Sequence, residues 1–284
     1  MIKWETYLNK QDVNNIKYRV VSYGGGTQST AMILLGLEGK LHARPDLAIY
    51  IDNKSDNSYT YDYIKIVSEY VKDKYGFEIV IVPGDNIIED IINGKLFGNN
   101  GKKYIQYTPP FHSNNKDGTK GILPRHCTSH YKIEPYWRYV RKRFDIKRSG
   151  VTKNAVVESW IGLSLDEIYR MSKSRLQWII NRYPLIENGY RRQDSIDYVK
   201  SVGLPEPPRT SCIFCPYQNV EYFKMLKNYY PNEFKKVIEI EQSIQDRMGE
   251  LYIFYDLVRI KDLDFKQATL FDPMVEDCGG LCGT

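Results

Sequence analysis

Short apolar runs of strand type alternate with amphipathic stretches in the first third of the chain. The runs are rich in β-branched residues, and each is followed by a segment whose apolar residues recur at helical spacing. The predicted strands cover residues 17–22, 47–51 and 77–82, and the predicted helices cover 27–38, 57–75 and 87–93. This order predicts an α/β fold with a parallel sheet covered by helices on both faces. We expect Asp85 to cap the third helix.

The pattern changes beyond residue 94. Residues 95–124 hold many Gly, Asn, Lys and Pro residues without a period, which predicts a long irregular insertion. Further on, we expect helices at 125–148, 164–170, 193–202, 220–229 and 232–248, and a strand at 155–163. The proline-rich sequence at 204–208 is typical of a stiff linker. We therefore expect an α/β domain over residues 1–205 and a small helical, cysteine-containing region over residues 206–284.

The composition is that of a folded globular protein. Of the 284 residues, 42% are hydrophobic and 26% are charged, which excludes a disordered chain and a fibrous one. No apolar stretch approaches the roughly 18 residues of a membrane span, and the first residues lack the apolar core of a secretion signal. We therefore expect a cytoplasmic protein with no membrane partner. The five cysteines, an odd number, then favour metal binding or redox chemistry over a disulfide framework.

A glycine-rich turn joins the first predicted strand to the first predicted helix. Three consecutive glycines let the backbone turn tightly and approach a ligand closely, and the helix that follows offers unpaired N–H groups. The pattern fits a phosphate cradle or, more simply, a tight strand-to-helix turn. It is neither a Walker A sequence nor the G-x-G-x-x-G fingerprint. The candidate nucleotide-binding residues are Ser22, Gly24, Gly25, Gly26, Thr27, Gln28 and Ser29.

Two further features carry chemistry. Asp52 ends the second predicted strand, where it would hold a ribose hydroxyl or Mg²⁺, or cap a turn. Cys212 and Cys215 form a C-x-x-C turn, which chelates a metal or forms a redox pair.

The segment 125–148 is strongly basic. It contains eight basic and two acidic residues, interleaved with five aromatic ones. Such a segment suits the phosphates and bases of tRNA or DNA. It suits equally a helix with one core face and one solvated face, so both interpretations stay open here.

Six segments, in order along the chain, resemble a known family. The glycine loop resembles the SGGxDS-type loop of the PP-loop ATP pyrophosphatases, also called adenine nucleotide alpha-hydrolases. The whole set is similar to the phosphoadenosine phosphosulfate reductase family within that group, many members of which are carried by phages. Beyond the loop, the matching segments are IDN at 51–53 with TYD at 60–62, RHCT at 125–128 with KIEP at 132–135, IGLSLDE at 161–167 with RM at 170–171, YPLI at 183–186 and SCIFCPY at 211–217. The sequence departs from the family in Thr27-Gln28, where many members have Lys-Asp, and in a single cysteine at 127, where iron–sulfur members have two.

The resemblance implies a PP-loop fold that binds an adenine nucleotide, either ATP or phosphoadenosine phosphosulfate. It also implies that Cys127 joins Cys212 and Cys215 around a metal centre. The fourth ligand would be one of the two tail cysteines, Cys278 or Cys282, and we assign it to Cys282. A [4Fe–4S] cluster is favoured over Zn²⁺ on the resemblance, because the spacing alone fits both.

The resemblance also suggests residues for the reaction. Asp166 and Arg170 are four residues apart, so they can pair on one helix face, and they become catalytic candidates on the substrate side of the site. Cys278 lies in a glycine-rich tail and is the candidate nucleophile toward an activated sulfur.

Three functions compete at this point. The first is a sulfonucleotide reductase, which releases sulfite and needs a thiol reductant. The second is an ATP-dependent enzyme that thiolates or modifies bases of tRNA or DNA and needs a sulfur donor. The third is a non-catalytic nucleic-acid-binding module with a structural zinc. A homodimer is compatible with each of them.

Overall fold

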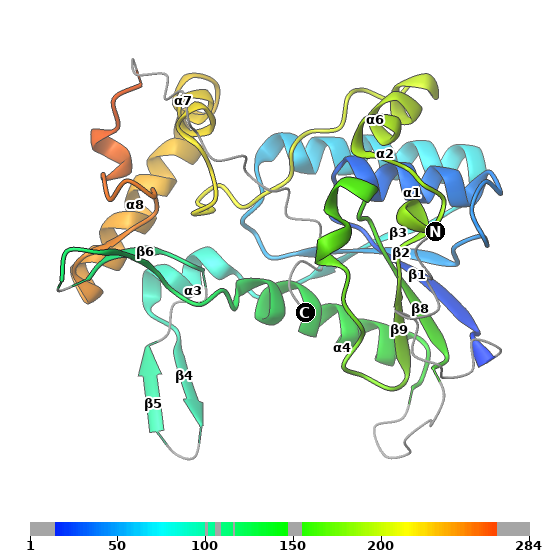
Figure 1. Ribbon diagram of the computed structural model, residues 1–284, viewed down its shortest axis with the longest axis horizontal. Coiled ribbons are helices and arrows are strands. Elements are labelled where there is room, and N and C mark those ends of the chain that lie inside the picture. The colour runs from blue at the N-terminus through cyan, green and yellow to red at the C-terminus, as the bar shows by residue number, and fades with distance from the viewer. Residues whose placement is uncertain (1–14, 100–101, 106–108, 116, 147–154, 266–284) are drawn as a thin grey trace.

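A five-stranded parallel sheet forms the centre of the computed structural model, which describes residues 15–99, 102–105, 109–115, 117–146 and 155–265 (Figure 1). The strand order is β3-β2-β1-β8-β9, and every neighbouring pair is parallel. The strands are β1 (Tyr18–Ser22), β2 (Leu47–Asp52), β3 (Ile79–Pro83), β8 (Val157–Ile161) and β9 (Ile179–Arg182). The prediction of an α/β fold with a parallel sheet is confirmed.

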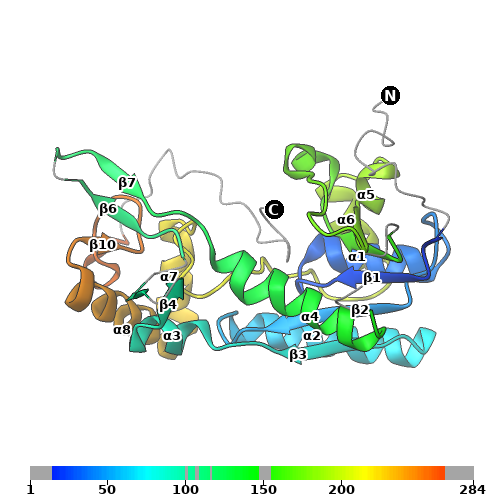
Figure 2. The ribbon, with the colours of Figure 1, turned by 90° about the horizontal axis from the view of Figure 1, so that it is seen from below.

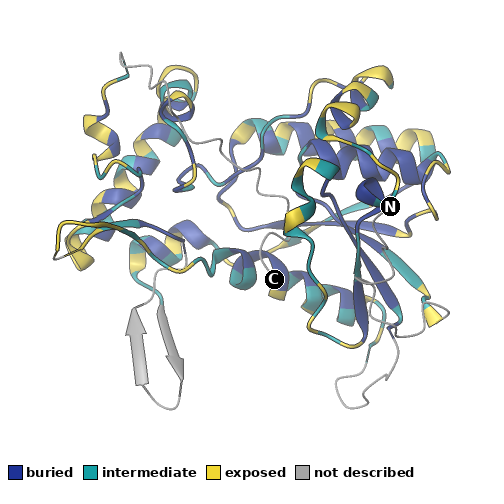
Figure 3. Cartoon of the chain, viewed as in Figure 1, coloured by how far each residue is buried: buried dark blue, intermediate teal, exposed yellow. Residues whose placement is uncertain are grey.

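Helices cover both faces of this sheet, as Figure 2 shows from below. One face packs against α1 (Thr27–Leu37), α2 (Ser58–Tyr75) and α6 (Arg192–Ser201), and the other against α4 (Glu134–Arg143). Successive side chains of a strand point to opposite faces, so Val21 joins the first core and Val20 the second. All eleven residues of α1 are buried, which explains why the helix is apolar on every side beyond its polar first turn (Figure 3).

A second unit lies beside the sheet and has a hydrophobic core of its own, centred on Phe223. It contains α3 (Ile87–Asn93), α7 (Val220–Tyr229), α8 (Pro231–Met248) and the short turn η5 (Ile260–Asp262). The chain enters this core twice, because Phe111 and Tyr131 pack there together with residues beyond 212. The predicted boundary between 205 and 206 stays a prediction. Throughout the described residues, no helix is both long enough and apolar enough to cross a membrane.

Residues 95–124 are not the irregular insertion that the sequence predicts. They contain the antiparallel hairpin of β4 (Leu96–Asn99) and β5 (Lys102–Ile105). They also contain β6 (His112–Asn114) and β7 (Lys120–Ile122), which form a second antiparallel sheet with β10 (Leu251–Tyr252). The predicted cap was also wrong by one residue, because the side chain of Asn86 accepts hydrogen bonds from Ile88 N and Glu89 N.

The basic segment does not form one continuous α-helix. It passes through a π-helical turn, η3 (Ser129–Ile133), before α4 begins at Glu134. A π turn holds one more residue than an α turn and is frequent at functional sites. The short helix α5 (Pro184–Glu187), like β9, was not predicted.

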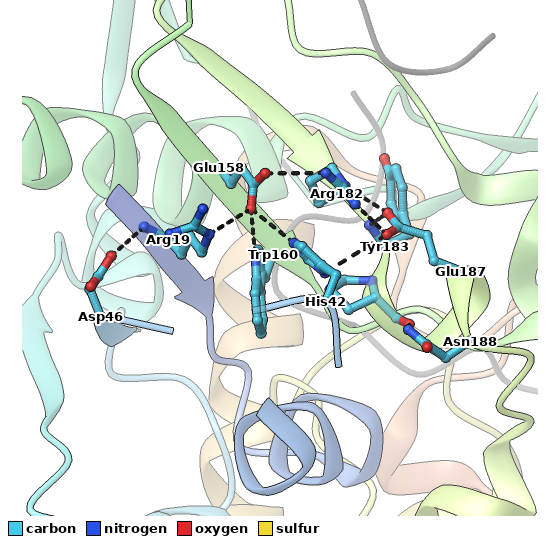
Figure 4. A network of polar contacts seen from close by, with 10 residues as sticks. Arg19, His42, Asp46, Glu158, Trp160, Arg182, Tyr183, Glu187 and Asn188 are labelled. Atoms are coloured by element: carbon cyan, nitrogen blue, oxygen red, sulfur yellow. Dashed lines mark hydrogen bonds and ion pairs between the residues drawn. The ribbon is translucent and has the colours of Figure 1, made fainter. Parts of the chain in front are cut away.

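A buried charge network ties three strands of the sheet together (Figure 4). Glu158 on β8 is only 2% exposed, and its carboxylate lies 3.5 Å from Arg19 Nε and 3.1 Å from Arg182 Nη1. His42 Nε2 and Trp160 Nε1 each lie 3.1 Å from Glu158 Oε2. Burial alone would raise the pKa of Glu158, but the hydrogen bonds from His42 and Trp160 and the charge of Arg182 outweigh it, so the pKa is lowered.

Candidate functional site

The glycine loop lies at the carboxyl edge of the sheet, between β1 and α1. Gly25 has φ +74°, a conformation that residues with a Cβ rarely adopt, and a Cβ there would lie 2.9 Å from the Ile64 side chain. A Cβ on Gly26 would lie 2.9 Å from Thr210 Oγ1, so the segment around Thr210 covers the loop. The hydroxyl of Ser29 donates to Gly26 O at 3.2 Å and fixes the turn. The loop shape therefore depends on glycine at both positions.

Two buried hydroxyls beside this loop have no hydrogen-bond partner among the described residues. Thr27 Oγ1 belongs to the first residue of α1, and Thr60 Oγ1 lies on α2 near Gly25. A buried polar group without a partner costs free energy, so such groups usually mark a place where a ligand or water binds. The N-terminus of α1 adds unpaired N–H groups and the positive end of the helix dipole. Together these donors suit an anion such as a phosphate.

We expect the variant Gly25→Ala to bind adenine nucleotide about 10–100-fold more weakly, since a displacement of roughly 1 Å can cost about 10²-fold. The new methyl group would collide with Ile64 and strain a left-handed backbone. Gly39→Ala is the matched control, because Gly39 has φ +71° but nothing lies within 4 Å of the added Cβ. Calorimetric titration with ATP measures the affinity of both variants. Equal affinity in the two variants would contradict the assignment of the loop.

Asp52 lies one loop further along the same edge of the sheet. Its Oδ1 accepts hydrogen bonds from Lys54 N at 3.0 Å and from the Tyr61 hydroxyl at 2.9 Å, and Oδ2 pairs with Lys54 Nζ. Burial would raise the pKa of Asp52, but these hydrogen bonds outweigh it and the pKa is lowered. The carboxylate is thus ionised at neutral pH, as a group that holds Mg²⁺ or a ribose hydroxyl must be.

The segment after β8 contacts the glycine loop and the start of α1 through Gly162 and Glu167. The predicted residues Asp166 and Arg170 do not make these contacts. A Cβ on Gly162 would lie 2.8 Å from Ser29 N, so glycine is needed where β8 ends against α1. Gln28 Nε2 donates to Glu167 Oε2 at 2.9 Å, and Glu167 in turn forms an ion pair with Arg170. This chain of contacts connects the loop to the 3₁₀ helix η4 (Leu165–Arg170).

The prediction that Asp166 pairs with Arg170 was wrong, because Arg170 forms its ion pair with Glu167. In a 3₁₀ helix, residues three apart lie on one face, so Glu167 takes the place beside Arg170. Asp166 is exposed and accepts hydrogen bonds from Ser164 Oγ at 3.2 Å and from Arg192 N, the first residue of α6, at 2.6 Å. The contacts of Asp166 thus fix the start of α6, whereas Arg170 is linked to the glycine loop through Glu167.

Cys127, Cys212 and Cys215 line one small cavity of about 30 Å³. All three are half-buried, and they come from two segments more than 80 positions apart in sequence. The C-x-x-C turn is closed by a hydrogen bond from Cys215 N to Cys212 O at 3.0 Å. It is held against the loop after β2 by two bonds, from Ser55 Oγ to Cys212 Sγ at 2.9 Å and from Ile213 N to Ser55 O at 2.8 Å. The fold thus brings together the three cysteines that the family resemblance groups around a metal centre.

Lys132 lies in the wall between the cysteine cavity and the glycine loop. It lines the cavity of the three thiols and also a second, smaller cavity bounded by Ser22 and Gly24. The side chain is 11% exposed, and its Nζ is 3.9 Å from Asp56 Oδ1. Asp56 is itself buried and accepts a hydrogen bond from the Tyr50 hydroxyl at 2.5 Å. A buried ammonium group is therefore held between the two parts of the site.

No three His, Cys, Asp or Glu side chains among the described residues converge closely enough to hold a single metal ion. Cys278 and Cys282, the expected nucleophile and fourth ligand, lie outside the described residues.

Sequence reasoning missed four contributors to the site: Lys132 as a charged group, Glu167, Gly162 and Thr210. Lys132, Gly162 and Glu167 each stood inside a family-like segment, so a signal for all three was available. Thr210 matters only because another part of the chain approaches it, and linear spacing carries no signal for that.

Comparison with known proteins gives little beyond this geometry. No family model matches the chain, and no curated protein matches it. Among solved structures, it is similar to the U34-tRNA thiolase NcsA from Methanococcus maripaludis with its [4Fe-4S] cluster, with 17% identity and a TM-score of 0.40. The likeness covers 87% of this chain and 78% of that one. A likeness of this strength identifies neither a family nor an activity.

Proposed function

We propose that this protein binds an adenine nucleotide at the glycine loop and uses it in sulfur chemistry at the cysteine cavity, as an enzyme of the PP-loop kind. The observation that carries the proposal is the shared wall at Lys132. One buried cation borders both the loop, which has unpaired donors suited to phosphate, and the cavity, which has three thiols. An ammonium group in this position would stabilise the negative charge that develops when the nucleotide reacts with sulfur.

In this proposal the phosphates lie at the N-terminus of α1, against the backbone of Gly24, Gly25 and Gly26 and the hydroxyl of Thr27. Ser22 and Ser29 border the same position, and Gln28 is held by Glu167. Asp52 binds a ribose hydroxyl or Mg²⁺. Arg170 belongs to the substrate side through its pairing with Glu167.

For the metal centre we take a [4Fe–4S] cluster over Zn²⁺. Thiolates are the usual ligands of iron–sulfur clusters, and three thiols line this one cavity. Thiolates also hold structural Zn²⁺, so metal analysis distinguishes the two. Cys127, Cys212 and Cys215 would hold the cluster with Cys282, and it would supply a polarising or electron-storing centre beside the nucleotide.

For the reductase reaction, the thiolate of Cys278 attacks the sulfur of a phosphosulfate. An S–S bond forms, the S–O bond to phosphate breaks, and the nucleotide leaves with its phosphate oxygen. A thiol reductant then attacks the cysteine sulfur, which leaves a disulfide and releases sulfite. The loop binds the departing phosphate and Lys132 stabilises its charge.

ATP-dependent thiolation or base modification is the second candidate. The observation that favours it is the set of exposed cations on α4, which starts two residues after Lys132. In that reaction an oxygen of the base would attack the α-phosphate of ATP bound at the loop. The base would become adenylated, and pyrophosphate would leave. The non-catalytic module with a structural zinc remains the outcome expected if nucleic acid binds, with strong dependence on salt, and no turnover occurs.

The test is to purify the protein without oxygen, measure iron, sulfide and zinc, and then assay two substrates. We expect iron and sulfide in stoichiometric amounts, and sulfite released from phosphoadenosine phosphosulfate with a dithiol present. AMP and pyrophosphate formed from ATP would instead support the second candidate. Cys212→Ser should lose both iron and turnover, whereas Ser243→Ala, on the partly buried surface of α8, should keep both. Zinc without iron, and no turnover of either nucleotide, would contradict the proposal.

A further inference from the structure

A groove of about 570 Å³ runs along α4, away from the cavities described above. Its floor and walls come from α4 and from the loop 171–178, which lies next to it. The lining residues are Glu134, Trp137, Arg138, Arg141, Lys142, Asp145, Ile146 and Leu176. Three cations and one tryptophan are thus brought together in an open groove.

The cations of this groove are not neutralised by the protein. Arg138 and Lys142 are exposed and form no ion pair with a carboxylate of the described residues, and the same is true of Lys173 on the neighbouring loop. The two carboxylates that face the groove are Glu134, which lies 3.5 Å from His130 Nδ1, and Asp145 at its far end. The surface of the groove therefore carries a net positive charge.

Arg141 is held in position before any ligand binds. Its guanidinium lies 5.2 Å from the centre of the Trp178 ring, and its buried Nε has no hydrogen-bond partner among the described residues. A guanidinium that rests on an aromatic ring is pre-organised for bidentate contact with phosphate. On an ordinary solvated helix face an arginine side chain is not fixed by a ring. The contact of Arg141 with Trp178 therefore distinguishes this groove from such a face.

The groove also leads toward the proposed active site. Its helix has ten residues and so spans about 15 Å, and it begins two residues after Lys132. Trp137 is half-buried on the groove side near the start of the helix, where it offers a ring on which a base can stack. Glu134 lines the groove and Lys132 lines the cavity of the three thiols, so a strand that continued past Glu134 would run toward that cavity.

From these observations we propose that the α4 groove binds a single-stranded or looped nucleic-acid segment and directs one nucleotide toward the cysteine cavity. Phosphates contact Arg138, Arg141 and Lys142, and the base nearest the cavity stacks on Trp137. The inference deepens the proposed function, on which it rests for the chemistry at the cavity. The binding itself depends only on the groove.

The test uses fluorescence anisotropy of the full chain with a labelled 20-nucleotide single-stranded RNA, a labelled RNA hairpin and the matching DNA strands, at several salt concentrations. The test variant is the double replacement Arg138→Glu and Lys142→Glu. The matched control is Lys65→Glu with Lys72→Glu, two exposed lysines on α2 that give the same change in net charge. We expect affinity to fall by at least about tenfold in the test variant only. The slope of its salt dependence should fall by about 0.7 for each phosphate that the variant no longer binds, so by roughly 1.4 for two phosphates.

Tighter binding of the RNA or of the DNA strands would show which nucleic acid the groove prefers, and either result would support the proposal. Three results would overturn the proposal: no binding by the unmodified protein, equal weakening in both variants, or equally tight binding of heparin of the same charge. Nucleotide turnover without nucleic acid should be the same in the test variant and the unmodified protein. The failure of the groove can thus be told apart from the failure of the proposed function.

Discussion

Replacing Lys132 with methionine is expected to lower turnover by about 10²–10³-fold, which is the usual effect of removing one donor that stabilises developing charge. Nucleotide affinity should change much less, because the glycine loop remains intact. The physical reason is the position of the ammonium group, which borders both the loop and the thiols. The measurement is kcat and KM for whichever nucleotide the protein turns over, with Lys65→Met on the exposed face of α2 as the control.

A loss of folding could imitate this result, because the variant leaves the buried carboxylate of Asp56 without its cation. The double variant Lys132→Met with Asp56→Asn removes that unpaired charge while the amide can still accept from Tyr50. We expect the double variant to regain stability but not turnover. Recovery of turnover in the double variant would mean that Lys132 serves only to neutralise Asp56.

Glu158→Gln should lower the free energy of unfolding by about 3–5 kcal/mol, since removing one partner of a buried ion pair leaves the other charge uncompensated. Arg19 and Arg182 would both lose the negative charge of Glu158, although Arg182 would keep its ion pair with Glu187. One of the two oxygens that face Arg182 on one side and His42 and Trp160 on the other would become an NH₂ donor (Figure 4). Denaturation by urea measures the change, and Glu69→Gln on the exposed face of α2 is the control. A loss below about 1 kcal/mol, the value typical of surface pairs, would contradict the assignment.

The same residue gives a dependence on pH. The pKa of Glu158 is lowered from its ordinary value of 4.5, so the unfolded chain takes up this proton more readily than the folded one. The stability that the ionised carboxylate supplies is therefore complete above about pH 4.5 and is lost as the pH falls through the lower folded value. The acid-induced loss of stability should be smaller in Glu158→Gln, because the amide does not titrate.

The strands β1 and β2 could be predicted from the sequence because residues on both of their faces are buried. Val20 and Val21 pack in different cores, so the middle of β1 is apolar on both faces and stands out from its surroundings. The strands β6 and β7 are three residues each and read HSN and KGI, which carry neither alternation nor an apolar run. They exist because pairing with β10, far along the chain, stabilises them.

The candidate site was predictable to the extent that its chemistry lies in local segments. The glycine loop and the C-x-x-C turn stand out in the sequence. The pairing around Arg170 was not predictable, because a 3₁₀ turn replaces the spacing of four by a spacing of three. The position of Thr210 next to Gly26 was not predictable either, because the two residues are far apart in sequence and only the fold brings them together.

Two separate parts of the sequence pack in the second core, and this has a consequence for protein synthesis. The ribosome produces Cys127 and Lys132 long before Cys212 and Cys215, and the cavity of the three thiols cannot form until the later segment has docked on Ser55. The nascent protein can form local helices early, but its sheet needs β8 and its thiols need the C-x-x-C turn. Any metal centre that needs all three thiols can therefore form only after the C-x-x-C turn has been synthesised and has docked.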